Sequence, residues 1–500
     1  MILSRRHFMA GGTAAIAATG LPTALNAAET GRLRPSQMRA DLDLLQRAYE
    51  TVHPGLLRYL PVGGFAARVT AAKDWARRDR SLAEFYIALA RITASIRCGH
   101  THPNPFNQSD AASAALFGGR NRLPFAFRWI DGEMIVTGGR AGASALAPGS
   151  RITMIDGTPA RDLLAAMLPL TRADGGNDAK RVAQLGIGAT DRYAAFDVFR
   201  PLLKPARTSG TVRLGLIGPQ GRKRLLEVGA LTEAEIQAAR APDDAPLDWP
   251  FAIRPDRIGV LSMGDWATYR TKWDWKAYLD GVLDRLIDEG AKGLIIDLRG
   301  NEGGTECGWH ILERLVAADL TVPQFRRRLR YRTLPSDLNP FLDTWDRGFR
   351  DWGETAQGPD AEGFYDRVQA VPDEATISPR GRRFGGPVAV LVDSACSSAT
   401  FQFANALSGS GVATIIGEPT GGNRRGINGD AYFFVRLPET GLEVDLPIVG
   451  IFSARPEPDA GIIPDRLVRV TAEDVALGRD RQFAAALAVV GGDPGTGTTS

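Results

Sequence analysis

A candidate nucleophile lies where an apolar run changes into a series of small residues. Residues 388–392 read as a buried strand, residues 394–400 are Ser-Ala-Cys-Ser-Ser-Ala-Thr, and residues 401–407 return to apolar side chains at helical spacing. A helix that begins here would place free backbone N–H groups and the positive end of its dipole beside a hydroxyl. This arrangement suits a serine whose oxyanion is stabilised by backbone donors. A buried corner between a strand and a helix would show the same small residues.

Three side chains in this stretch could attack a carbonyl: Cys396, Ser397 and Ser398. The chain has only 3 cysteines, at positions without framework spacing, so disulfides are not expected to hold the fold together. Cys396 therefore stays a rival to the two hydroxyls, and the residues of this stretch alone leave the choice open.

A glycine-rich loop is the second stretch that could do chemistry. Residues 294–297 form an apolar strand, and residues 297–304 are Asp-Leu-Arg-Gly-Asn-Glu-Gly-Gly. Glycines allow the backbone to approach a ligand closely, and a helix is expected to follow. Neither nucleotide-binding pattern, G-x-x-x-x-G-K-[ST] or G-x-G-x-x-G, is present, so a nucleotide loop is not expected.

Four elements in order resemble the tail-specific (C-terminal processing) protease superfamily, peptidase family S41. They are the loop 297–304, the stretch 390–399, Gly-Glu-Pro-Thr-Gly-Gly at 417–422 and Gly-Ile-Ile-Pro-Asp at 461–465. The likeness is to the branch that contains the tricorn proteases and the interphotoreceptor retinoid-binding protein repeats. It implies a mixed α/β, multidomain chain: a crotonase/ClpP-like ββα spiral catalytic domain, an N-terminal helical region and a PDZ-like, β-rich domain.

The resemblance implies roles for residues in both loops. The family's nucleophile falls on Ser398, Ala399 supplies one oxyanion-hole N–H, and the turn of Gly303 and Gly304 supplies the second. Ser397 stands where the family has a small residue, and Cys396 comes too early on the turn. The remaining motif residues are expected to be structural: Asp297, Arg299 and Asn301.

The chain departs from the family's Ser-Lys branch, because Asn423 stands where that branch has its lysine. Arg424 and Arg425 follow, but a guanidinium remains protonated and cannot act as a base. The tricorn-like branch draws a histidine from a Gly-His-(Thr/Ser) motif, which residues 98–101 match. The resemblance therefore implies His100 as the general base, with His102 as its neighbour.

That branch also orients its histidine with a carboxylate just before the Gly-Val-x-Pro-Asp element. Here Asp459 is the best match and Glu457 the alternative. The implied reaction is acyl transfer through a Ser398 acyl-enzyme. No metal and no cofactor are expected, because no His-Glu-x-x-His or comparable ligand cluster occurs. The absence of G-x-S-x-G disfavours an α/β-hydrolase esterase.

The expected function is an exported, serine-type peptidase that acts on peptides or unfolded protein tails. The alternative is a non-catalytic binder of a hydrophobic ligand or peptide, because the retinoid-binding relatives have the same fold. The presence of both Ser398 and the Gly-His motif favours the enzyme. With 60 basic and 57 acidic residues, the chain has no general affinity for nucleic acid. Nothing in its composition indicates an oligomeric state.

The first residues read as a twin-arginine export signal, 1–28. Arg5 and Arg6 precede Phe8, and a Gly/Ala/Thr-rich run that is too short to span a bilayer ends in small, cleavable residues. No later stretch is long and apolar enough for a membrane helix. The sequence therefore predicts a periplasmic or secreted protein.

Changes in hydrophobic period divide the rest of the chain. Met38, Leu42, Leu45 and Tyr49 recur at helical spacing, whereas short strands and an Asp-Gly turn follow from about Leu123. The predicted regions are an N-terminal helical region (31–115), a PDZ-like, β-rich domain (120–245), a catalytic domain (251–490) with a possible insertion or lid (321–384), and a disordered tail (491–500).

Overall fold

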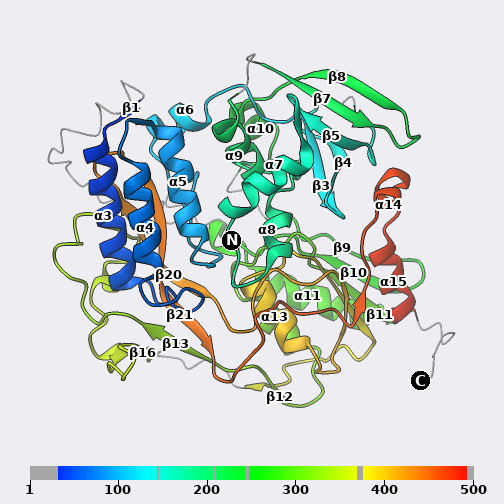
Figure 1. Ribbon diagram of the computed structural model, residues 1–500. Helices are drawn as coiled ribbons and strands as arrows, with labels where there is room; N and C mark the ends of the chain where they lie inside the picture. Colours follow the sequence, from blue (N-terminus) through cyan, green and yellow to red (C-terminus); the bar gives the residue numbers. More distant parts are fainter. Residues whose placement is uncertain (1–31, 144–145, 206–209, 243–246, 369–375, 492–500) are drawn as a thin grey trace.

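A computed structural model describes residues 32–143, 146–205, 210–242, 247–368 and 376–491. The predicted export signal lies outside these residues, as does the predicted tail after Gly491. Within the described chain, helices gather at the N-terminal side and three larger sheets form the remainder (Figure 1). No helix among these residues is long and apolar enough to cross a membrane.

The N-terminal region is helical, as the sequence predicts. Its elements are β1 (Arg32–Leu33), α3 (Pro35–Val52), α4 (Gly64–Trp75), β2 (Arg80–Ser81), α5 (Leu82–Ala94) and α6 (Asp110–Phe117). The predicted apolar stripe of α3 is fully buried, from Met38 to Tyr49. Helix α5 begins with a capping box in which Ser81 and Glu84 exchange hydrogen bonds, which fixes where the chain enters the helix.

The middle region is a sheet of order β3-β4-β5-β7-β8, with β6 beside β5. The strands are β3 (Phe125–Ile130), β4 (Glu133–Gly139), β5 (Arg151–Ile155), β6 (Thr158–Pro159), β7 (Thr211–Ile217) and β8 (Lys223–Gly229). Its helices are α7 (Ala160–Met167), η2 (Leu168–Leu170), α8 (Asp178–Gln184), α9 (Ala195–Leu203) and α10 (Glu233–Ala238). Asp156 and Gly157 have positive φ between β5 and β6, so the predicted tight turn is confirmed. The PDZ-like character of this region stays a prediction.

A mostly parallel sheet of order β22-β19-β18-β11-β10-β9 carries both chemistry-bearing loops. Its strands are β9 (Phe251–Ile253), β10 (Ile258–Ser262), β11 (Gly293–Asp297), β18 (Val388–Val392), β19 (Thr414–Gly417) and β22 (Arg466–Leu467). The helices of this part of the chain are η3 (Thr268–Arg270), α11 (Trp275–Asp288), α12 (Cys307–Leu312), α13 (Ala399–Leu407), α14 (Ala472–Leu477) and α15 (Arg481–Val490).

Both faces of this sheet are buried, which explains why its strands are continuously apolar. Ile296 and Val390 pack with α11, α12 and α13 on one face, and Ile295 and Leu391 pack with α15 on the other. Strands β11 and β18 are parallel neighbours, with Asp297 opposite Leu391. The loop after β11 and the turn after β18 therefore leave the same edge of the sheet, where open α/β sheets bind their ligands.

Strands from the described part of the segment 321–384 join β20 and β21 in a second sheet of order β14-β20-β21-β13-β16-β15. Its strands are β13 (Phe325–Leu329), β14 (Leu342–Asp343), β15 (Ala356–Gln357), β16 (Tyr365–Arg367), β20 (Asn428–Arg436) and β21 (Glu443–Ser453). Beside them lie η4 (Arg347–Arg350), η5 (Gly353–Thr355) and a separate pair, β12 (Leu320–Thr321) with β17 (Thr376–Ile377). Leu329 and Leu342 are fully buried core residues. The segment thus completes a sheet, which differs from the expected lid outside the core.

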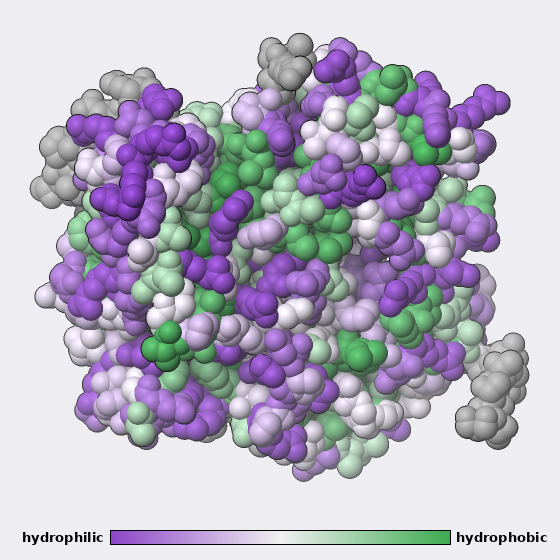
Figure 2. All heavy atoms as spheres, viewed as in Figure 1, coloured by the Kyte–Doolittle hydropathy of each residue, from purple (hydrophilic) through white to green (hydrophobic). Residues whose placement is uncertain are grey.

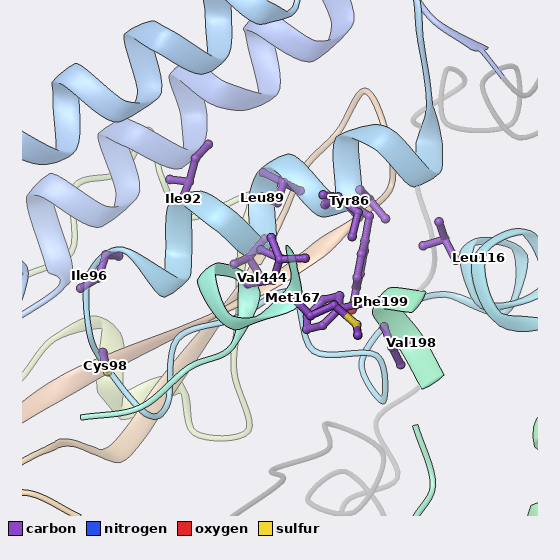
Figure 3. Packing of buried hydrophobic residues seen from close by; sticks show 14 of the residues in the cluster. Tyr86, Leu89, Ile92, Ile96, Cys98, Leu116, Met167, Val198, Phe199 and Val444 are labelled. Atoms are coloured by element: carbon purple, nitrogen blue, oxygen red, sulfur yellow. The ribbon is translucent and has the colours of Figure 1, made fainter. Parts of the chain in front are cut away.

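The sheet that contains β20 and β21 shares one hydrophobic core with the helical region and the middle region. Figure 3 shows Tyr86 and Leu89 of α5 beside Val444 of β21 and Met167 of α7. On the face seen in Figure 2, polar side chains predominate, and hydrophobic ones gather at the upper centre, between α5 and the middle region. Because the core is shared, the regions that the sequence separates do not pack independently.

Candidate active site

Ser398 occupies a strained turn between β18 and α13. Its backbone has φ 54° and ψ −127°, and it is the N-cap residue of the helix. A non-glycine residue with positive φ costs free energy and persists only where its surroundings enforce it. The same kind of turn carries the nucleophile in hydrolases whose serine lies between a strand and a helix. No hydrogen bond between described residues involves the Ser398 hydroxyl, so it is available to a substrate.

The two rival nucleophiles are engaged elsewhere. The Cys396 Sγ donates to the carbonyl oxygen of Leu298 at 3.1 Å, and the residue is fully buried. Burial raises the pKa of the Cys396 thiol well above its ordinary value, so the reactive thiolate is disfavoured. Ser397 Oγ donates to the carbonyl oxygen of Glu302 at 3.4 Å. These contacts favour Ser398 as the nucleophile.

Gly303 packs directly against the nucleophile turn. A Cβ atom on Gly303 would lie 2.7 Å from the carbonyl oxygen of Ser397 and 2.9 Å from the nitrogen of Ala399, and φ of Gly303 is +96°. Only glycine fits this position without displacing the turn. The loop and the turn are therefore in backbone contact, as an oxyanion hole shared between them requires.

The N–H groups at this contact are not all available. Gly303 N–H donates to Asn301 Oδ1 at 2.8 Å, so this expected oxyanion donor is already engaged. Among the described residues, no hydrogen bond involves the N–H of Ala399 or of Gly304. The candidate oxyanion hole therefore consists of Ala399 and Gly304, one from each segment.

Asn301 ties three segments together around this hole. Its Oδ1 accepts from Gly303 N–H at 2.8 Å and from Thr400 Oγ1 at 2.7 Å, and its Nδ2 donates to the Met263 carbonyl at 2.7 Å. The side chain is fully buried, so each bond replaces water that the group has lost. Asn301 therefore holds the glycine loop against the first turn of α13.

The other two motif residues face away from this hole. Arg299 pairs with Asp297 at 2.6 Å and with Asp480 of the segment before α15 at 2.8 Å. These ion pairs join the loop to the C-terminal helix, which fits the structural role expected for both residues. Asp393, at the start of the Ser398 turn, accepts hydrogen bonds from the N–H groups of Gly300 and Ala395. These bonds stabilise the turn against the glycine loop.

A buried lysine that the sequence analysis did not single out supports the nucleophile turn. Lys180 of α8 lies 2.5 Å from Glu302 and donates to the carbonyl oxygen of Ala395 at 2.8 Å. Only 5% of its side chain is exposed. No motif surrounds Lys180, and its contacts are made only when α8 packs on the loop, so no sequence signal could have found it.

His100 follows α5 in the turn that the Gly-His motif predicts. It is buried, and its Nδ1 atom has no hydrogen-bond partner among the described residues. Burial lowers the pKa of His100 well below its usual range, and the charges of Arg172, Glu302 and Lys180 also act on it. Glu302 belongs to the glycine loop that contacts the Ser398 turn. The imidazole is consequently neutral at neutral pH, which is the form that accepts a proton.

Asp174 is the carboxylate that lies beside His100. A ring nitrogen of His100, an oxygen of Asp174 and the Sγ of Cys98 all lie within 4.8 Å of one another. Asp174 also accepts a hydrogen bond from Gly99 N–H at 2.8 Å. Sequence reasoning missed Asp174 because its loop has no family motif and its contact with Gly99 spans 75 residues.

The two expected orienting carboxylates bind other partners. Asp459 accepts from Asn423 Nδ2 at 2.6 Å and from Gly176 N–H at 2.9 Å. Glu457 pairs with Arg424 at 2.8 Å. Among the described residues, neither carboxylate is hydrogen-bonded to His100. Asp459 therefore hydrogen-bonds to the loop that contains Asp174, and not to the ring of His100.

His102 points to a different carboxylate. Its Nδ1 lies 3.7 Å from Asp445 Oδ2. Asp445 is fully buried and accepts from Asn104 and Asn107, each at 2.8 Å. His102 thus belongs to a polar cluster under β21, separate from the trio of Cys98, His100 and Asp174.

Asn423 joins the histidine side of the site to the nucleophile side. Its Nδ2 donates to the carbonyl oxygen of Asp174 at 3.2 Å as well as to Asp459. Two residues earlier, Gly421 N–H donates to the carbonyl oxygen of Cys396 at 2.7 Å. The position that is a lysine in the Ser-Lys branch is here a buried amide that links the segments.

Comparison with known proteins bears on this geometry. Residues 257–448 match the model of peptidase family S41. This part of the chain is similar to that family. The match covers β10 to β21, which include the glycine loop and the Ser398 turn. It confirms the family that the motifs predict and supports a peptidase.

Solved structures share the fold at low sequence identity. Mature CPAF has a TM-score of 0.61 and 16% identity, over 93% of this chain and 99% of that one. Mature CPAF complexed with lactacystin has the same TM-score and identity, over 91% and 98%. No curated protein matches the chain by sequence. At this identity the likeness shows the fold alone.

Proposed function

We propose that this S41-family protein is an exported serine peptidase in which Ser398 is the nucleophile and His100 the general base. The observation that carries the proposal is the backbone of Ser398, strained at positive φ at the N-cap of α13. Strain at a position with a free hydroxyl and adjacent free N–H groups is typical of an assembled nucleophile turn.

The proposed reaction is acyl transfer in two steps. His100 accepts the Ser398 proton as Oγ bonds to the peptide carbonyl carbon, and the resulting oxyanion binds the N–H groups of Ala399 and Gly304. The C–N bond then breaks, and His100 gives its proton to the leaving amine. In the second step His100 takes a proton from water, the hydroxide attacks the ester, and the proton returns to Ser398.

We propose Asp174, rather than Asp459 or Glu457, as the residue that positions His100. Asp174 holds the turn before the histidine through Gly99 N–H and lies within 4.8 Å of the ring. Asp174→Asn, Asp459→Asn and Glu457→Gln test the three carboxylates in parallel. Asp174→Asn should cause the largest fall in kcat with little change in KM, because orientation of the base acts on the chemical step. An equal or larger fall for Asp459→Asn would restore the carboxylate that the family implies.

The substrate class is peptides or unfolded protein tails, as membership of a peptidase family supports. A casein-like unfolded protein is the first substrate to test. If the protein labels with a fluorophosphonate but cleaves neither casein nor peptides, the proposed substrate is wrong. If it neither labels nor cleaves, the non-catalytic binder is favoured.

Export is part of the proposal and rests on the twin arginine, Arg5 and Arg6, before the apolar run. Fractionation of cells that express the full chain should find the processed protein outside the cytoplasm. Replacement of both arginines by lysine should retain the precursor inside. Unchanged export of that variant would exclude the twin-arginine route.

The decisive experiment is labelling of the purified protein with a fluorophosphonate probe. Wild type should label, and Ser398→Ala and His100→Ala should not. Ser397→Ala is the matched control, because it removes a neighbouring hydroxyl that donates to Glu302. Labelling that survives Ser398→Ala would disprove this nucleophile, and full labelling of His100→Ala would disprove this base.

A further inference from the structure

Three different metal-binding groups meet at the proposed general base. The Sγ of Cys98, a ring nitrogen of His100 and a carboxylate oxygen of Asp174 lie within 4.8 Å of one another. All three residues are buried, at 1%, 7% and 4% exposure. The Nδ1 atom of His100 is buried without a hydrogen-bond partner among the described residues. The trio thus includes a polar atom that the protein leaves unsatisfied.

We propose that Cys98, His100 and Asp174 bind a zinc ion reversibly, and that the bound zinc blocks the peptidase reaction. The inhibitory part rests on the proposed role of His100. Thiolate, imidazole and carboxylate are the groups that bind Zn²⁺ in proteins, and a thiolate selects against Mg²⁺ and Ca²⁺.

The trio needs only a small contraction to bind zinc. Bonds of about 2.0–2.3 Å in a tetrahedral site put ligand atoms on the order of 3.5 Å apart. The present separations of up to 4.8 Å therefore shorten by about 1.3 Å at most when a metal enters. Three protein ligands leave the fourth position to water.

Neighbouring groups already hold two of the ligands in place. Asn428 Nδ2 donates to Cys98 Sγ at 3.4 Å, and Gly99 N–H donates to Asp174 at 2.8 Å. Such outer partners orient ligands and increase the affinity of metal sites. A Cβ at Gly99 would lie 2.5 Å from Asp174 Oδ2, so a larger residue there would displace this carboxylate.

The charges around the site favour reversible binding of Zn²⁺ over a permanently bound ion. The positive charges of Arg58, Arg172 and Lys180 act on Asp174. They oppose a divalent cation, whereas the Asp174 carboxylate and a Cys98 thiolate attract it. On binding, the Zn–S bond replaces the S–H bond and the thiol proton passes to water. These opposing charges predict that zinc binds reversibly and that a chelator removes it.

Zinc at this position prevents His100 from acting as a base through either ring nitrogen. If the metal binds the nitrogen that accepts the Ser398 proton in the proposed reaction, it occupies that lone pair directly. If it binds the other nitrogen, the neutral ring carries its proton on the nitrogen that the proposed reaction needs as acceptor. In both cases Ser398 loses its proton acceptor, and the acylation step is lost.

The site is tested first without catalysis, on the Ser398→Ala protein titrated with Co²⁺. A cobalt–thiolate charge-transfer band in the near ultraviolet is expected, and excess Zn²⁺ should abolish it. Adding Cys98→Ala should remove the band, whereas adding Cys307→Ala, the loss of another buried cysteine, should keep it. A band that persists without Cys98, or no band in Ser398→Ala, overturns the site.

A second measurement does not depend on how the Cys98 variant folds. X-ray absorption at the zinc edge, on zinc-loaded Ser398→Ala protein, should show one sulfur at about 2.3 Å with nitrogen and oxygen neighbours. A shell of nitrogen and oxygen alone would overturn the assignment.

The inhibitory part is tested by fluorophosphonate labelling of the otherwise wild-type protein. Zinc should abolish labelling and a chelator should restore it. Half-inhibition of Cys98→Ala should need at least about tenfold more zinc, since even an outer partner of a metal ligand contributes that much. Equal zinc sensitivity of both proteins overturns the inhibition. If cobalt binds through Cys98 but Ser398 never labels, the metal site stands and the proposed peptidase reaction falls.

Discussion

The Nζ atom of Lys180 lies 2.8 Å from the carbonyl oxygen of Ala395, three residues before Ser398. A buried ammonium group from the middle region thus supports the turn that strains the nucleophile. Glu302, at 2.5 Å, neutralises the lysine from the facing loop. The pair thus bridges both loops and holds their backbones in place.

Replacement of Lys180 by methionine should slow fluorophosphonate labelling. Met keeps the length of the side chain but leaves the Ala395 carbonyl unpaired, which costs about 1–3 kcal/mol. Urea unfolding and the labelling rate measure the two effects. Lys180→Met combined with Glu302→Gln should recover part of the stability, because the lone carboxylate charge is removed. Labelling at the wild-type rate in Lys180→Met would show that the pair does not position the turn.

Replacement of Asn301 by alanine should destabilise the protein and abolish labelling. The change leaves buried groups of Met263, Gly303 and Thr400 without partners, so the loss should exceed the about 1–3 kcal/mol of one orphaned group. Thr400→Val removes one of these bonds and should cost only about 0.5–1.5 kcal/mol. Equal losses of unfolding free energy in the two variants would show that Asn301 does not stabilise the three segments together.

Gly303→Ala should abolish labelling, because its Cβ would meet the backbone of Ser397 and Ala399 at 2.7 and 2.9 Å. Gly300→Ala is the matched control: its φ is also positive, at +83°, but no atom lies within 4 Å of the added Cβ. Both variants should lose about 1–3 kcal/mol from backbone strain. Only Gly303→Ala should lose the nucleophile's reactivity, as seen from labelling of folded protein. Similar labelling of both variants would mean that the contact with the turn is unimportant.

Stability should fall as the pH is lowered from 7 to 5, with His53 as one cause. Burial lowers the pKa of His53 to about 3 from its ordinary 6.5. Between these values the unfolded chain binds a proton that the folded chain does not. The stabilising contribution is therefore present above pH 6.5 and is lost as the pH falls toward 3.

At pH 5 this loss amounts to about 2 kcal/mol. His53→Asn should show a smaller fall in unfolding free energy by about that amount. Asn can keep the acceptor that Gly55 N–H uses in the wild type, at 3.1 Å. Parallel pH profiles of the two proteins, measured by urea unfolding, would contradict the assignment.

Iodoacetamide should leave the native protein and its fluorophosphonate labelling unchanged at neutral pH. Burial raises the pKa of the Cys396 thiol well above its ordinary value, and the thiol donates to Leu298. Mass spectrometry should find Cys396 alkylated only after denaturation. If iodoacetamide blocks labelling of wild type but not of Cys396→Ala, the thiol belongs to the reacting groups.

The strand, turn and helix around Ser398 could be predicted because their pattern is local. An apolar strand followed by small residues and an apolar helix specifies the turn through neighbouring residues. The same holds for the glycine loop after β11 and for the helical spacing of α3. The family resemblance, rather than this pattern, implies that Ala399 supplies an N–H beside the hydroxyl.

Contacts between distant segments could not be predicted in this way. Lys180 meets Glu302 across 122 residues, and Asp174 meets Gly99 across 75. Neither Lys180 nor Asp174 has a motif around it, so their roles depend on how α8 and its preceding loop pack. The hydrogen bond of Gly303 to Asn301 likewise decides which glycine N–H is free, and spacing alone does not show it.

By itself, the sequence determined the family motifs, the nucleophile turn and the histidine motif, because each depends on a few consecutive residues. Only the tertiary structure decided that Asp174 and Cys98 lie beside His100. It also showed that Lys180 supports the turn and that strands β13 to β16 complete a sheet with β20 and β21. The physical reason is that burial and pairing of polar side chains depend on which distant segments share a core, and a local pattern does not specify that packing.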